Sequence, residues 1–128
     1  MSWKREHHRR WYLLGLLLVL SVLYTSLVPA RDLPPIGFND KLEHGTAYVL
    51  MMVWFGGLLP LRQYAWLVAG LLALGGGVEI AQWLMALGRT GEWLDFAADA
   101  GGVAAGLLLC LLGLRHWATW IERWWFGP

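Results

Sequence analysis

The segment from residue 64 to residue 87 has the sequence YAWLVAGLLALGGGVEIAQWLMAL, and this stretch decides the fold. Nearly all of it is apolar, and it is as long as the ~20 residues that a helix needs to cross a ~30 Å hydrocarbon core. Comparable apolar blocks occupy residues 11–28, 42–59 and 96–114. Because backbone polar groups in lipid must be satisfied within each segment, all these blocks are predicted to be helices. We therefore expect an all-α, polytopic membrane protein, a compact bundle of about four transmembrane helices.

The composition indicates that lipid surrounds this chain. Of its 128 residues, 58% are hydrophobic and 15% are charged, whereas a small soluble domain buries too little surface to hide so much apolar area. The net charge of +1 gives no reason to expect a nucleic acid partner. Membrane lipids are the predicted partners, and protein partners are left open. The single cysteine, Cys110, is interpreted as a small apolar residue within a helix.

The first apolar block leaves two interpretations open. Basic residues precede it, as in a signal peptide, and Val28-Pro29-Ala30 resembles a cleavage site. The apolar stretch is nevertheless long for a signal peptide and close to the minimum length of a membrane span. A retained helix is the favoured interpretation.

The distribution of Lys and Arg predicts the orientation, because these residues are enriched in cytoplasmic segments. One side of the predicted bundle carries seven of them: Lys4, Arg5, Arg9, Arg10, Arg62, Arg115 and Arg123. The other side carries three: Arg31, Lys41 and Arg89. The basic N-terminus (residues 1–10) and the C-terminus are therefore predicted to be cytoplasmic, and loops 29–41 and 88–95 to lie outside.

The tail, residues 115–128, differs from the apolar blocks. Its aromatic and apolar residues recur at three- and four-residue steps: Trp117, Trp120, Ile121, Trp124 and Trp125. This pattern predicts a short Trp-rich amphipathic helix lying in the cytoplasmic interface. Anchoring of the last span is the favoured role, and docking of a partner is the alternative.

Polar residues within or beside the spans are the candidates for a functional site, because placing an ionisable group in lipid costs roughly 2.5–3.5 kcal/mol. The predicted cluster comprises Asp40, Lys41, His44, Tyr48, Glu79, Gln82, Arg89, Asp95 and Asp99. Asp40 and Lys41 precede His44 by four and three positions, so each can share a helix face with it. Gln82 follows Glu79 by three positions and Asp99 follows Asp95 by four, so each of these pairs also shares a face. We expect these faces to meet at the non-cytoplasmic end of the bundle, with Glu43 and Glu92 solvated outside the cluster.

Small residues are predicted to allow close helix packing around this cluster. Ala98, Gly102 and Gly106 repeat at four-residue steps, as in the small-xxx-small motifs of membrane helix interfaces. The run of glycines at residues 75–77 is also interpreted as a packing feature. An unwound segment at the same place, as in some transporters, is the alternative.

The polar residues in this order resemble the VanZ-like family of small integral membrane proteins. The matching motifs are Asp-Lys-x-x-His with a Tyr four positions later (Asp40, Lys41, His44, Tyr48), Glu-x-x-Gln (Glu79, Gln82), and an Arg followed by Asp-x-x-x-Asn/Asp and a Gly (Arg89, Asp95, Asp99, Gly102). The match covers about residues 38–112, and Asp99 departs from the Asn that is common in the family. The resemblance implies a multi-pass protein of the bacterial plasma (inner) membrane and a link to teicoplanin-type glycopeptide resistance.

The cluster supports several functions. The first is binding of a lipid head group, a cell-wall lipid intermediate or a lipophilic antibiotic. The second is an enzyme acting on a phosphate-bearing lipid, with His44 as base and Glu79 as acid. A buried charge network that only fixes helix register is a further alternative, as is ion movement. A divalent metal site is also left open, because His44, Glu79, Asp95 and Asp99 offer one imidazole and three carboxylates. These residues come from separate helices, so spacing cannot establish such a site, and no cofactor is predicted.

Overall fold

The computed structural model describes residues 2–27, 40–85 and 93–126, and the side chains within residues 9–27, 43–84 and 94–125. Its helices are α1 (Ser2–Leu27), α2 (Asp40–Gly56), α3 (Tyr64–Met85), α4 (Trp93–Leu111) and α5 (Trp117–Phe126). Short 3₁₀ turns at Leu61–Gln63 and Leu114–His116 precede α3 and α5. These described residues contain helices and no strand, which confirms the all-α prediction.

Within the described ranges, three segments are long and apolar enough to cross a membrane: Arg9–Leu27, Leu61–Leu84 and Leu94–Leu111. The fourth predicted span, residues 42–59, corresponds to α2, which has 17 residues and ends at Gly56. Its first five residues include Asp40, Lys41, Glu43 and His44, so its apolar part is shorter than a full span. In contrast, α1 begins at Ser2 and continues the first apolar block through the basic N-terminus.

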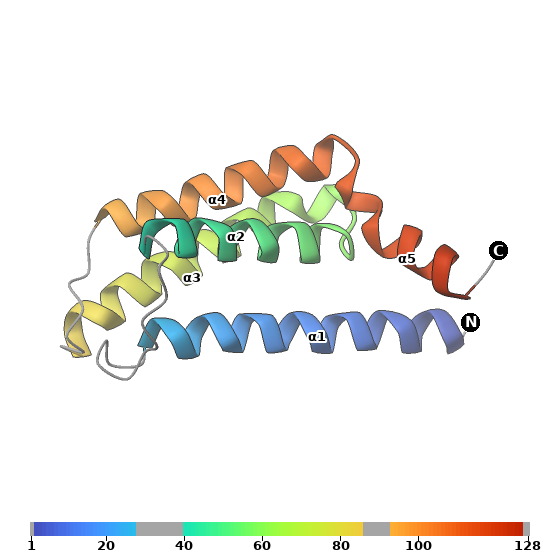
Figure 1. The fold of residues 1–128 in the computed structure, drawn as a ribbon, viewed down its shortest axis with the longest axis horizontal. Helices are drawn as coiled ribbons and strands as arrows, with labels where there is room; N and C mark the ends of the chain where they lie inside the picture. Colours follow the sequence, from blue (N-terminus) through green and yellow to red (C-terminus); the bar gives the residue numbers. More distant parts are fainter. Residues whose placement is uncertain (1, 28–39, 86–92, 127–128) are drawn as a thin grey trace.

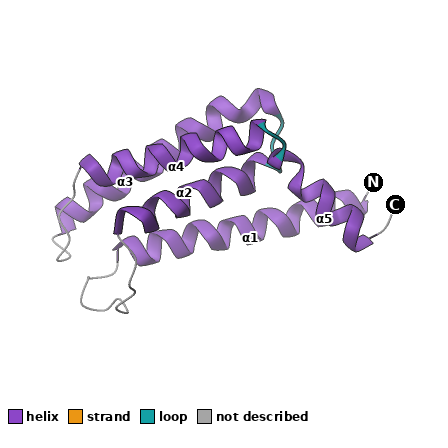
Figure 2. Ribbon diagram, turned by 45° about the horizontal axis from the view of Figure 1, so that its top comes forward, coloured by secondary structure: helices purple, strands orange, loops and turns teal. Residues whose placement is uncertain are grey.

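The helices α1 to α4 run in alternating directions along a common axis (Figure 1). The start of α1 and the end of α5 lie at one end of the bundle, and the start of α2, the end of α3 and the start of α4 lie at the other (Figure 1). The closest pair is α2 and α4, with α3 and α1 packed beside them. Figure 2 shows the same helical arrangement from a second direction.

The outer surface of this bundle is apolar, and its interior combines an apolar core with several polar residues. Large apolar side chains are exposed along α1, α3 and α4, among them Leu17, Tyr24, Trp66, Ile80, Trp83, Leu108 and Leu112. Among the side chains that the structure describes, the buried polar ones are Ser26, His44, Glu79, Gln82, Asp95 and Asp99. Soluble monomers rarely expose such large apolar patches, so this arrangement fits a lipid environment.

Glycines of α4 bring it into direct contact with α2. A Cβ atom placed on Gly102 would overlap the carbonyl oxygen of Gly45, and one placed on Gly106 would lie 2.7 Å from Cβ of Met52. Ala98 belongs to the same contact, because its carbonyl oxygen lies 3.6 Å from the Cβ position of Gly45. This close approach is what positions the polar ends of α2 and α4 against each other.

Three of the last four carbonyl groups of α2 accept hydrogen bonds from side chains outside the helix, and the fourth, that of Phe55, accepts from backbone N–H groups. The Tyr64 hydroxyl donates to the Gly56 carbonyl at 2.6 Å. Nε1 of Trp117 donates to the carbonyls of Val53 and Trp54 at 2.8 and 3.2 Å. A helix leaves its last four carbonyls without internal partners, and burial makes such groups costly, so these bonds stabilise the end of α2. Trp117 is buried and therefore belongs to the bundle core, apart from the exposed Trp residues of α5.

Replacing Trp117 by Phe is expected to lower the free energy of unfolding by about 1–2 kcal/mol, because the Trp54 carbonyl loses the bond from the indole N–H while the apolar ring is largely kept. Reversible unfolding of the purified protein in mixed detergent micelles measures this change. Trp124→Phe is the matched control, since Trp124 is 80% exposed and should tolerate the substitution. Equal loss of stability in both variants would contradict the role assigned to Trp117.

Candidate functional site

Three helices each contribute one side chain to a buried polar cluster, which we call the His44–Glu79–Asp99 cluster. His44 lies near the start of α2, Glu79 in the second half of α3, and Asp99 in the first half of α4. Nδ1 of His44 lies 3.0 Å from Oδ1 of Asp99. Each of the three residues offers a nitrogen or oxygen atom that lies within 4.8 Å of those of the other two. Residues separated by up to 55 positions in the sequence thus meet at one point.

The cluster is almost fully enclosed. The exposed fractions of His44, Glu79 and Asp99 are 8%, 9% and 0%. Among the residues that the structure describes, Oδ2 of Asp99 makes no hydrogen bond. Burying a carboxylate oxygen without a partner is unfavourable, so the site is suited to a group that supplies a proton or a positive charge to this atom.

Tyr48 and Gly75 line the cluster. Tyr48 is buried one helical turn after His44 on α2. A Cβ placed on Gly75 would lie 2.9 Å from Oδ2 of Asp99 and 3.4 Å from the Tyr48 hydroxyl. Gly75 therefore lets α3 approach Asp99. The sequence pointed to the glycine run as a packing feature but did not indicate which glycine faces the carboxylate.

The structure places two further predicted residues near the same end of the bundle. Gln82, one turn after Glu79, is buried, and its side-chain amide nitrogen donates to the Ser26 carbonyl of α1 at 2.7 Å. Asp95, one turn before Asp99, is also buried. Gln82 therefore links α3 to α1, a contact that the sequence did not predict because α1 carries no ionisable partner at that depth.

Several predicted residues are outside what the structure describes. Arg89 and Glu92 lie between the described ranges, and the side chains of Asp40 and Lys41 are likewise outside them. Glu43 is exposed, in keeping with its predicted position outside the cluster. The helix α3 is continuous through residues 75–77, so the alternative of an unwound segment there is wrong.

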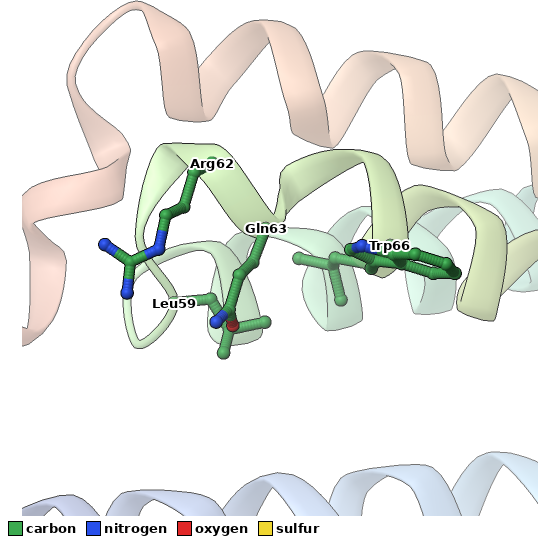
Figure 3. Close-up of a pocket in the computed structure, with 5 residues that line it drawn as sticks. Leu59, Arg62, Gln63 and Trp66 are labelled. Carbon is green, nitrogen blue, oxygen red and sulfur yellow. The ribbon is translucent and has the colours of Figure 1, made fainter.

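A hollow lies at the other end of the bundle. It measures about 670 Å³ and is lined by Leu59, Arg62, Gln63, Trp66 and Leu67, beside the connection from α2 to α3 (Figure 3). It shares no residue with the predicted cluster. Its lining is apolar apart from Arg62 and Gln63, and it opens widely to the surroundings, so it lacks the converging polar groups of a specific binding site.

The chemistry of the cluster is dominated by acceptors. It combines one imidazole with two carboxyl groups. Such a set can bind hydrogen-bond donors, such as sugar hydroxyls or an ammonium group, and it can ligate a cation. It can also move a proton, because imidazole titrates near neutral pH. Binding of a phosphate would require a positive charge from another residue or from an ion.

Over the ranges that the structure describes, the protein is all-helical, has three helices long and apolar enough to cross a membrane, and buries ionisable residues toward one end of the bundle. Searches for similar proteins found no matching family model, no matching curated protein and no matching solved structure.

Proposed function

We propose that this chain is a VanZ-like integral membrane protein that binds the polar head group of an amphiphile. The observation that carries the proposal is the convergence of His44, Glu79 and Asp99 from three helices at one buried point. The apolar outer surface around this point suits the acyl or prenyl chains of the same ligand. The ligand classes are a membrane lipid, a cell-wall lipid intermediate and a lipophilic antibiotic of the teicoplanin type.

The proposed orientation has four spans, with α2 as the shortest, in a bacterial plasma membrane. Both termini are cytoplasmic, because seven of the ten Lys and Arg residues are on that side. The cluster then lies near the non-cytoplasmic surface, where cell-wall intermediates and antibiotics are found. The α5 helix, with Trp120 and Trp124 exposed, lies in the cytoplasmic interface as an anchor.

Native mass spectrometry of the protein extracted in a mild detergent tests this proposal. We expect a bound amphiphile of defined mass, and we expect Glu79→Gln to weaken its retention by about tenfold, since bonds to charged groups are worth about 1.5–3 kcal/mol. Glu43→Gln is the matched control, because Glu43 is on the same helix as His44 but is exposed. If wild type, Glu79→Gln and Asp99→Asn retained the amphiphile equally at equal membrane abundance, the proposal would be wrong. The cluster would then serve only as a structural charge network.

A second candidate is an enzyme acting on a phosphate-bearing lipid. The contact between His44 and Asp99 favours it, because a carboxylate beside an imidazole orients a general base. Turnover of the retained amphiphile by wild type, lost in His44→Ala, would support catalysis. Unchanged ligand mass after prolonged incubation would exclude it.

A further inference from the structure

We infer that the His44–Glu79–Asp99 cluster is a binding site for a divalent transition-metal ion of the Zn²⁺ class. The inference deepens the proposed function, because it names the group that would recognise an anionic head group at the same site. Ion binding itself depends only on the three side chains; its role in ligand recognition rests on the proposed function.

The donor set fits such an ion. One imidazole nitrogen and two carboxylate oxygens are ligands that Zn²⁺ accepts, whereas Mg²⁺ prefers oxygen ligands and water. Adjacent ligands around tetrahedral Zn²⁺, at bond lengths of about 2.0–2.2 Å, are separated by about 3.3–3.6 Å. Nδ1 of His44 and Oδ1 of Asp99 lie 3.0 Å apart, at hydrogen-bond distance, so an ion would have to separate them by only a few tenths of an ångström. One ligand atom of each of the three residues lies within 4.8 Å of the other two, so small side-chain movements would complete the set.

A second observation points independently to a cation. Oδ2 of Asp99 is buried and makes no hydrogen bond among the described residues. It lies against α3, 2.9 Å from the Cβ position of Gly75, and Glu79 follows Gly75 by one helical turn. A cation at this point would give Oδ2 of Asp99 a partner of opposite charge in the low-dielectric interior.

Three protein ligands leave a coordination position for a further group. Zinc sites that act on substrates keep such a position for water or for an oxygen of the substrate. The carboxylates of the cluster accept hydrogen bonds and offer no attraction to a phosphate. A bound ion would attract a phosphate or carboxylate oxygen directly, so it would make the cluster a receptor for anionic head groups.

Titration of the tag-free, chelator-treated protein in mild detergent with Zn²⁺ alone tests the site by calorimetry. We expect one high-affinity Zn²⁺ per chain, and affinity more than about 100-fold lower in Asp99→Asn and in Glu79→Gln, since even the outer-shell partners of metal ligands contribute 10–100-fold. Glu43→Gln is the control for general loss of negative charge, and His7→Gln with His8→Gln is the control for other histidines; both should bind as wild type does. Mg²⁺ should bind more weakly than Zn²⁺.

X-ray absorption at the zinc edge identifies the zinc ligands in the wild-type protein. It therefore tests the site even if a variant fails to fold. A single imidazole with oxygen ligands supports the assignment. A sulfur ligand from Cys110, several imidazoles, or absence of stoichiometric binding overturns it.

Binding of a polyprenyl phosphate with and without chelator separates the two proposals. Zn²⁺ binding with no retained amphiphile supports the ion site and contradicts the head-group function. Phosphate-lipid binding that persists in chelator, by a protein that binds no Zn²⁺, supports the function and overturns the ion site. Loss of both overturns both.

Discussion

Replacing Gly102 by Ala is expected to lower the free energy of unfolding by about 3 kcal/mol, because the added methyl group overpacks a contact made by backbone. The new Cβ would overlap the carbonyl oxygen of Gly45 and lie 3.0 Å from Cβ of Tyr48. No side-chain rotation can relieve a clash with backbone, so α2 and α4 must move apart. The separation would also remove the 3.0 Å contact between His44 and Asp99.

The neighbouring glycine provides a matched control for this prediction. A Cβ on Gly101 meets no atom within 4 Å, so Gly101→Ala should change stability by less than about 0.5 kcal/mol. Both variants are compared by unfolding in mixed detergent micelles, with membrane abundance as a second measurement. If Gly102→Ala unfolds at the same denaturant concentration as Gly101→Ala, the close crossing of α2 and α4 is not as described.

Replacing Gly75 by Val is expected to abolish retention of the amphiphile while the protein still inserts and folds. The Val side chain would occupy the space between α3, Oδ2 of Asp99 and the Tyr48 hydroxyl. Asp99 would have to turn away, which breaks the cluster, and the overpacking itself would cost about 1–3 kcal/mol of stability. Native mass spectrometry measures the amount of retained ligand, and circular dichroism measures the helix content.

Gly77→Val is the control for the effect of a branched residue in α3. Gly77 is exposed and its Cβ position meets nothing within 4 Å, so ligand retention should equal that of wild type. If Gly75→Val retained as much ligand as wild type does, the ligand would bind elsewhere. The hollow beside Trp66 and Arg62 would then be the next site to test.

The helices could be predicted from the sequence because their apolar blocks are continuous, and the i, i+4 spacing of Asp95 and Asp99 correctly put both on a buried face of α4. The convergence of His44, Glu79 and Asp99 followed from the cost of ionisable groups in lipid. Because of that cost, every helix turns its ionisable side chains away from lipid. The inward-facing side of each helix can therefore be predicted without knowledge of the packing.

Other features depend on three-dimensional contacts that no periodicity encodes. The end of α2 at Gly56 depends on hydrogen bonds from Tyr64 and Trp117, which approach from later parts of the chain. The bond between Gln82 and the Ser26 carbonyl depends on where α1 lies beside α3. The spacing of Trp117 groups it with the interfacial Trp residues of the tail, yet its ring packs against that of Trp54 at a centroid distance of 4.4 Å.

The shared position of the start of α1 and the end of α5 has a consequence for engineering (Figure 1). Two copies joined in tandem through a short linker would each keep the same topology, since the second copy begins where the first one stops. A concatemer carrying one wild-type and one Gly75→Val unit would then reveal whether each copy works independently. The same proximity makes circular permutation, with a new opening between α2 and α3, a geometrically simple rearrangement of this fold.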